Sequence, residues 1–125
     1  MNLALWVVAG VLAGVFVISS SAKLFVPKEK LATVPLGGWT RDASAGFVKD
    51  LGAVEVLAAV GLVLPAVLDI APVLVPLAAV GVVLLMVGAI VTHGRRHEAV
   101  GIALNLTYLA MATFVAWGRF GPESF

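Results

Sequence analysis

Cysteine is absent from this 125-residue sequence, and charge is scarce. Without a thiol, the chain alone cannot perform disulfide exchange or thiolate catalysis, bind a c-type haem covalently, or hold a cysteine-ligated iron–sulfur cluster. Charged residues make up 12% of the chain and hydrophobic residues 62%, whereas a soluble domain has about a quarter charged residues. The net charge of +1 gives no indication of nucleic acid binding. The composition therefore indicates an integral membrane protein of one domain.

Four apolar segments are long enough to cross a bilayer, which takes about 20 residues per helix. They run from about 3 to 25, 47 to 68, 70 to 92 and 99 to 117. We therefore expect an all-α fold, a polytopic membrane protein with a four-transmembrane-helix bundle, as a single domain over residues 1–125. Asp69 is expected to cap the third helix, with Pro72 in its first turn, where a missing N–H costs little.

The first apolar segment has two features that need interpretation. Small residues at 19–22 resemble a signal-peptide cleavage site, but no Lys or Arg precedes the apolar core, so a retained helix is expected. Gly10 and Gly14 form a GxxxG motif, which allows close helix contact within the bundle or between protomers. Chance, together with packing inside the bundle, is the simpler explanation of the motif in a chain with 13 glycines.

Basic residues gather on one side of the predicted bundle. Those around the first loop and in the third are Lys23, Lys28, Lys30, Arg41, Lys49, Arg95 and Arg96, and only Arg119 lies on the opposite side. Because cytoplasmic loops carry an excess of Lys and Arg, this asymmetry predicts a multi-pass plasma-membrane protein with loops one and three cytoplasmic and both termini outside. Trp6 and Trp117 then fall near the same outer interface, as in an aromatic belt.

The first loop, from about Pro27 to Gly46, is the only long connection. Residues 28–34 could form an interfacial turn of helix, and residues 36–39 could carry Trp39 into the headgroup layer. Two interpretations stay open. The loop is either solvated, with basic residues near lipid phosphates, or a lid over a site that opens inward.

One carboxylate stands inside the second apolar segment, in the stretch LGAVEVLAAV of residues 51–60. Glu55 lies about two turns inside the membrane, on the order of 9 Å from Lys49. A charge at a helix centre costs roughly 2.5–3.5 kcal/mol on insertion scales, so such residues face the bundle interior and find partners. Lys23 is the nearest cationic candidate, because its long stem can reach inward or snorkel outward.

The other helices contribute polar groups to the same half of the bundle. His93 ends the third segment, and Asn105 and Tyr108 share one face of the fourth. The candidate site is this intramembrane polar cluster of Glu55, Lys23, His93, Asn105 and Tyr108. It is either a lock, in which Glu55, Lys23 and Asn105 satisfy one another and fix helix register, or the polar end of a ligand pocket or proton-handling site.

The two histidines do not predict a metal site. His93 lies at the interface and could simply be solvated. His93 and His97 straddle a Gly-Arg-Arg turn, which is poor geometry for joint ligation, so no metal is expected. The sequence also contains no Ser-His-acid set and no nucleotide-binding loop, and no catalytic residue is assigned.

Over nearly its whole length the sequence resembles the DoxX-like family of small four-helix membrane proteins. The resemblance is carried by SSSAKLF with Lys23, LGAVEVLAAVGLVLP with Glu55 and AAVGVVLLMVGAIVTHGRR with His93. It implies a four-helix fold in a bacterial inner membrane. The family is associated with redox and oxidative-stress settings, including subunits of quinone-linked thiosulfate oxidation, and many members have no assigned activity.

Three functions are compatible with these features. The first is a protein that binds a small apolar ligand, a quinone or a lipid, as an accessory of a redox or oxidative-stress system, with no intrinsic cofactor. The second is a membrane scaffold subunit that anchors a soluble enzyme through the basic first loop. The third is a small proton-coupled exporter, although such exporters carry their glutamate in the first helix. The expected partners are the lipid bilayer, an apolar small molecule, and a second copy or a partner redox protein.

Overall fold

Four long helices form the structure, a computed structural model that describes residues 2–33, 37–41 and 43–124. They are α1 (Asn2–Phe25), α3 (Ala45–Val67), α4 (Leu74–Arg95) and α5 (Ala99–Phe120). Each is long and apolar enough to cross a membrane. The predicted all-α bundle of four transmembrane helices is therefore confirmed, and every described element is helical.

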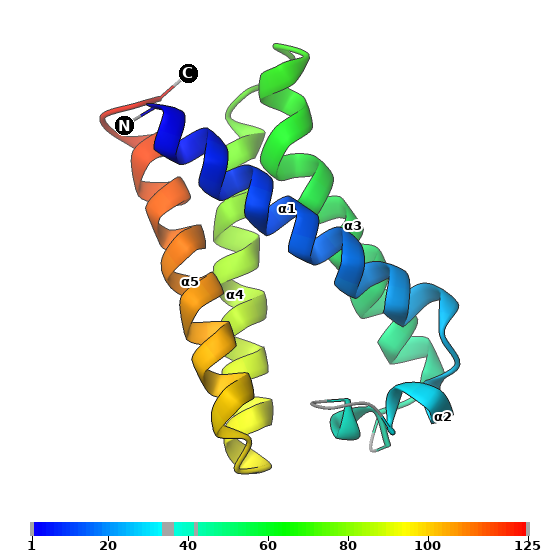
Figure 1. The fold of residues 1–125 in the computed structure, drawn as a ribbon. Helices are drawn as coiled ribbons and strands as arrows, with labels where there is room; N and C mark the ends of the chain where they lie inside the picture. Colours follow the sequence, from blue (N-terminus) through cyan, green and yellow to red (C-terminus); the bar gives the residue numbers. More distant parts are fainter. Residues whose placement is uncertain (1, 34–36, 42, 125) are drawn as a thin grey trace.

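The helices are arranged as two pairs. α1 packs chiefly against α3, and α4 packs chiefly against α5. The pairs lie close at the end that carries both chain termini and diverge towards the other end, which carries α2 (Lys28–Leu31), η1 (Gly38–Arg41) and the α4–α5 turn (Figure 1). We call these the terminal end and the loop end. The first and third loops thus share one end of the bundle, as the topology prediction requires, although which side of the membrane that end faces stays a prediction.

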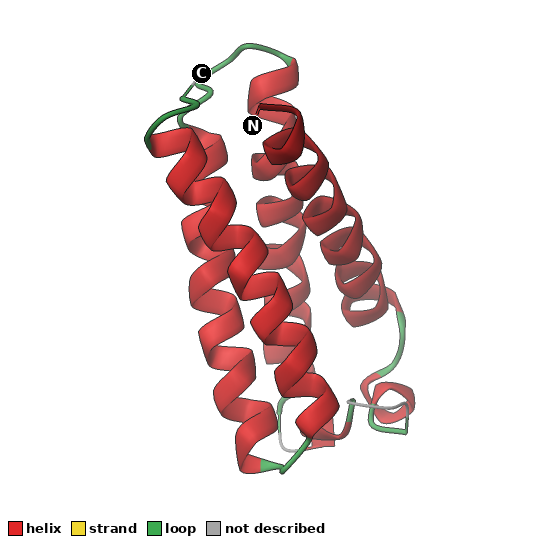
Figure 2. Ribbon diagram, turned by 60° about the vertical axis from the view of Figure 1, so that its left-hand side comes forward, coloured by secondary structure: helices red, strands yellow, loops and turns green. Residues whose placement is uncertain are grey.

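The core lies between the pairs in the half nearer the terminal end. Its most buried side chains include those of Leu12, Phe16, Leu62, Val82 and Val115. Large apolar side chains of all four long helices are exposed, which suits contact with lipid. Figure 2 shows the same helices from another side, with the described loops at the two ends of the bundle. Burial in the core weakens towards the loop end, where the pairs separate and polar side chains replace apolar ones.

The first loop is largely ordered into short helical turns. α2 confirms part of the predicted turn over 28–34, and residues 34–36 lie outside the described residues. Ser44 caps α3, because its side chain accepts a hydrogen bond from the N–H of Phe47 at 3.0 Å. The loop therefore returns the chain to the bundle with η1 placed at the loop end.

The prediction for the start of the third long helix was wrong. α4 begins at Leu74, its N-terminal cap is Val73 without a side-chain hydrogen bond, and Asp69 and Pro72 both precede it. Asp69 and Ala71 have φ angles of 53° and 47°, so the chain turns through left-handed backbone there. Ala71 precedes a proline, which disfavours the right-handed helical region, so the helix starts only after Pro72.

Close helix contacts occur at glycines other than the GxxxG pair. An added Cβ at Gly118 would come within 2.6 Å of Leu5, and one at Gly61 within 2.9 Å of Ala78. At Gly10 and Gly14 it would meet nothing within 4 Å, and both residues are exposed. The internal-packing part of the expectation for the GxxxG motif was therefore wrong, a chance occurrence agrees with the structure, and a contact between protomers stays a prediction.

Arg119 connects α5 to the start of the chain at the terminal end. It lies in the last turn of α5, beyond the predicted end of this helix. Its guanidinium donates at 2.8 Å to the side chain of Asn2 and at 2.8 Å to the carbonyl of Glu123. It also lies 5.8 Å from the ring centroid of Trp6. These contacts tie the first turn of α1 to the last turn of α5 and satisfy a charge that is almost fully buried.

Candidate functional site

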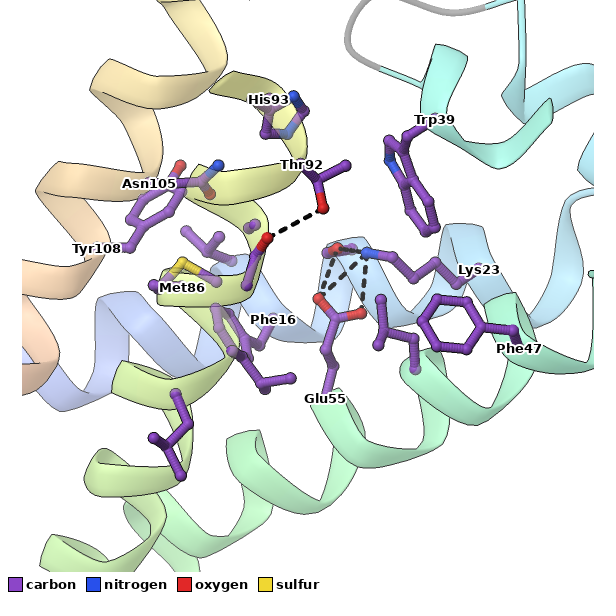
Figure 3. A pocket seen from close by; sticks show the side chains of 17 residues that line it. Phe16, Lys23, Trp39, Phe47, Glu55, Met86, Thr92, His93, Asn105 and Tyr108 are labelled. Atoms are coloured by element: carbon purple, nitrogen blue, oxygen red, sulfur yellow. Dashed lines mark hydrogen bonds and ion pairs between the residues drawn. The ribbon is translucent and has the colours of Figure 1, made fainter. Parts of the chain in front are cut away.

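A cavity of about 430 Å³ opens between the two helix pairs at the loop end. Its inner part is apolar, with Phe16 of α1 and Met86 of α4 among its walls. Its polar lining residues are Ser19, Lys23, Glu55, Thr92, His93, Asn105 and Tyr108. All five residues of the predicted polar cluster therefore border one pocket, and every long helix contributes to it (Figure 3).

Glu55 and Lys23 form a buried ion pair on the α1–α3 side. Lys23 Nζ lies 2.9 Å from Glu55 Oε2, and the two side chains are 15% and 8% exposed. Lys23 Nζ also donates to Glu55 Oε1 at 3.2 Å. The pairing expected from the sequence is thus present, with the lysine reaching inward rather than snorkelling outward.

Ser19 completes this arrangement, and sequence reasoning missed it. The Ser19 hydroxyl donates to Glu55 Oε1 at 3.0 Å and accepts from Lys23 Nζ at 2.7 Å. Ser19 precedes Lys23 by four residues, so both lie on the same face of α1, a spacing that could have identified it. Oε1 accepts hydrogen bonds from both side chains, and Oε2 is buried 2.9 Å from Nζ, so both carboxylate oxygens are held on the α1 side.

The close approach of α1 and α3 depends on Gly52, one turn before Glu55. A Cβ there would lie 3.0 Å from Leu24 Cγ and 3.1 Å from Lys23 Cβ. Even a methyl group there would require Lys23 or Leu24 to shift by a few tenths of an ångström, so the glycine favours the close contact of the ammonium with the carboxylate. The attraction within a buried ion pair offsets the desolvation of its charges only when the two groups are in close contact, as Lys23 and Glu55 are here.

His93 is held at the α4–α5 side of the pocket by a partner that the sequence analysis did not name. Its Nδ1 lies 2.7 Å from Glu98 Oε1, and Arg96 Nε lies 3.4 Å from the same oxygen. His97, with φ of 57°, turns the chain so that Glu98 comes back beside the ring. The expectation of a solvated His93 was wrong, since the residue is only 9% exposed.

Gly101 forms the wall behind the imidazole. A Cβ at Gly101 would come within 2.8 Å of His93 Cγ, 2.9 Å of Nδ1 and 3.1 Å of Cδ2. The ring is therefore fixed along this edge by α5 and at Nδ1 by Glu98, while no described residue forms a hydrogen bond with Nε2. His97 is exposed, and the described residues contain no cluster of three or more His, Cys, Asp or Glu side chains suited to a metal ion.

Asn105 and Tyr108 line the pocket from α5, across from the ion pair (Figure 3). Both are half-buried, and neither makes a hydrogen bond with a described residue. The proposed lock of Glu55, Lys23 and Asn105 is therefore limited to the first two residues together with Ser19. Asn105 and Tyr108 keep their hydrogen-bonding groups available at the pocket wall.

Trp39 of η1 lies at the outer part of the pocket, where the first loop meets the bundle. Its ring centroid is 5.9 Å from Lys23 Nζ, within the range of a cation–π contact. The guanidinium of Arg96 lies against Gly38, the preceding residue. The loop thus contacts both the ion pair and the α4–α5 turn. This position is compatible with the interpretation of the loop as a lid over the site.

The sequence model of the DoxX-like family matches residues 7–115, a range that includes every residue of the predicted polar cluster. No curated protein and no solved structure matches the chain.

Proposed function

The chain is a membrane protein of the DoxX-like family, and we propose that it binds a small apolar molecule with a polar head, a quinone or a lipid, in the pocket between its helix pairs. The observation that carries this proposal is the combination of an apolar inner wall with polar groups on two facing sides of one cavity. The volume of about 430 Å³ is in the range of small-molecule sites, and such sites use few polar groups to orient a mostly apolar ligand.

A quinone suits this arrangement better than a simple hydrocarbon. Its ring is apolar, and its two oxygen atoms lie at opposite ends. Lys23 and Glu55 lie at one side of the pocket, and His93, Asn105 and Tyr108 lie at the other. A bilayer supplies such ligands directly, because their tails partition into lipid.

We place the protein as an accessory of a redox or oxidative-stress system, which holds the ligand for a partner redox protein. The resemblance to the DoxX-like family supports this role, since that family includes subunits of quinone-linked oxidation. The exporter is less well supported, because Glu55 already accepts from Ser19 and Lys23 instead of facing the pocket as a lone exchanging carboxylate.

The scaffold hypothesis rests on the exposed basic residues of the loop end, among them Lys30, Arg41 and Lys49. The scaffold hypothesis requires no pocket. A small molecule that co-purifies with the protein would therefore favour the ligand-binding proposal over the scaffold. Capture of a soluble enzyme through the loop, without any retained small molecule, would favour the scaffold instead.

The test is native mass spectrometry of protein purified in mild detergent, with solvent extraction of the retained molecule. A bound apolar molecule is expected in the wild type and is expected to be lost in Gly88→Leu. Gly88 lines the pocket, and an added Cβ there would meet nothing within 4 Å, so the leucine occupies open space without a clash.

Gly81→Leu is the matched control. It lies on α4 two turns earlier, also has open space around an added Cβ, and does not line the pocket. Equal retention in both variants, or no retained molecule in the wild type, would contradict the proposed function.

A further inference from the structure

The pocket is open to the outside of the bundle on one side, between α3 and α4. Three of its described lining residues are exposed, and they are Phe47 of α3 and Leu84 and Gly88 of α4. Phe47 and Leu84 are 52% and 69% exposed. The described lining residues on α1 and α5 are all half-buried or buried. The cavity therefore reaches the surface of the bundle between α3 and α4.

This opening is limited to the half of the bundle nearer the loop end. Towards the terminal end the two helices touch, because a Cβ at Gly61 of α3 would lie 2.9 Å from Ala78 of α4. At Gly88, ten residues further along α4, an added Cβ would meet nothing within 4 Å. The two helices diverge in this direction (Figure 1). The opening is thus a gap that begins beyond the Gly61–Ala78 contact and widens towards the loop end.

At the loop end, η1 lies over the outer part of the pocket. Trp39 lines the pocket and is half-buried, and the neighbouring Gly38 lies against the guanidinium of Arg96. These contacts place the described part of the first loop between the pocket and the aqueous phase. The route that the described residues leave open is therefore the lateral one.

The rim of the lateral opening is apolar. Its three exposed lining residues carry no polar side-chain atom, whereas the polar groups of the pocket, Ser19 and Lys23 among them, lie further in. Leu84 lies about 15 Å along α4 from Leu74, which is near the middle of a hydrocarbon layer of about 30 Å. The opening therefore faces lipid chains, a medium in which a hydrocarbon tail has no contact with water.

We infer that the pocket takes a long-tailed amphiphile directly from the bilayer. The molecule enters between α3 and α4, places its polar head inside, and leaves its tail in the opening against Phe47 and Leu84. This inference rests on the proposed function and specifies the ligand class and its path. A volume of about 430 Å³ suits a head group with a short part of its tail, so the opening is what admits a longer one.

The first test locates the tail. The probe is a decyl-tailed benzoquinone with a diazirine midway along the tail, bound to the purified full-length protein in detergent. Crosslinks are expected on Phe47 and Leu84, and an excess of unlabelled decyl quinone should remove them. Competed crosslinks on exposed residues of the other two helices, such as Ile18 of α1 or Leu104 of α5, would overturn the inference.

The second test narrows the opening with Leu84→Trp. Calorimetry compares the decyl-tailed benzoquinone with tetramethylbenzoquinone, which has the head without the tail. The larger side chain occupies the position of the tail, so the ratio of decyl to tailless affinity is expected to fall about tenfold, the scale of a steric clash. Leu77→Trp is the matched control, because Leu77 is also an exposed leucine of α4 and does not line the pocket. It is expected to keep the wild-type ratio.

The outcomes separate this inference from the proposed function. A ratio unchanged by Leu84→Trp, or lowered equally by Leu77→Trp, would reject the α3–α4 opening as the position of the tail. Saturable binding of tetramethylbenzoquinone in that case would leave the head site intact. Absence of saturable binding of both quinones would reject the proposed function, and the inference with it. If Leu84→Trp fails to fold, the crosslinking of the wild type decides alone.

Discussion

At the scale of single residues, the buried pair of Lys23 and Glu55 explains how so apolar a chain carries a carboxylate in a transmembrane helix. Loss of one partner from a buried pair is costly because it leaves the other charge unpaired. The two partners are not equivalent here. Ser19 also donates to Glu55, but a hydroxyl cannot neutralise the carboxylate charge.

Replacement of either partner should therefore give unequal losses of stability. Lys23→Met is expected to reduce the free energy of unfolding by about 3–5 kcal/mol, because it strands a buried carboxylate. Glu55→Gln should cost only about 1 kcal/mol, since an amide still accepts from Ser19 and the lysine can snorkel outward. The double variant Lys23→Met with Glu55→Gln should recover most of the loss.

Thermal unfolding in detergent, followed by tryptophan fluorescence, measures these differences. If Lys23→Met were as stable as the wild type, the ion pair would have no structural role. Ligand retention by the same variants separates structure from function. A Glu55→Gln protein that stays folded but no longer retains the apolar molecule would assign the carboxylate to the pocket.

At the scale of elements, Gly101 of α5 allows this helix to lie close to His93 of α4 at the loop end. Gly101→Ala would bring a Cβ within 2.8 Å of the His93 ring, which must then move away from α5. We expect a destabilisation of about 1–3 kcal/mol, typical of overpacking, because the ring must leave its position between α5 and Glu98.

Gly81→Ala is the control for this change. It exchanges the same residue types within α4, where the added methyl group meets nothing within 4 Å. It should be neutral or slightly stabilising, since alanine favours helix over glycine. Equal unfolding temperatures of the two alanine variants would contradict the packing role of Gly101.

The sequence predicted the elements well and their ends less well. Four runs of apolar residues define four helices because a bilayer requires that length, whatever the tertiary contacts are. The start of α4 was misplaced because two left-handed residues, Asp69 and Ala71, delay it past Pro72. Left-handed backbone at residues other than glycine is uncommon, so no pattern in the sequence indicated it.

The members of the candidate site could be predicted because residues in the same half of a four-helix bundle lie near one another. Glu55, Lys23, His93, Asn105 and Tyr108 all lie at similar depth, and all border the pocket. The contact of His93 with Glu98 was missed because it depends on a backbone reversal at His97. The pairing of helices also escaped the sequence, since it depends on glycine contacts that hydropathy does not report.

At the scale of the whole molecule, both basic loops lie at the same end, and the termini lie at the other (Figure 1). This relation follows from four consecutive crossings. The direction in the membrane is a prediction from charge, because seven of the eight Lys and Arg residues belong to the loop end or the helix ends beside it.

Single cysteines should reveal this direction, since the chain contains none of its own. Thr33 at the loop end and Ser124 at the terminal end are both exposed. In intact cells, a membrane-impermeant maleimide is expected to label Ser124→Cys and to spare Thr33→Cys, which should react only after permeabilisation. Labelling of Thr33→Cys from outside would reverse the predicted orientation.

The central claim is that an apolar ligand with a polar ring occupies the pocket between the helix pairs. Photo-crosslinking with an azide-bearing, short-tailed quinone, followed by peptide mapping, locates the bound molecule directly. Crosslinks are expected on pocket residues such as Met86 and Tyr108, and an excess of the unmodified quinone should abolish them. Crosslinks spread over exposed residues outside the pocket, such as Leu57 and Val60, and insensitive to competition would contradict the ligand site.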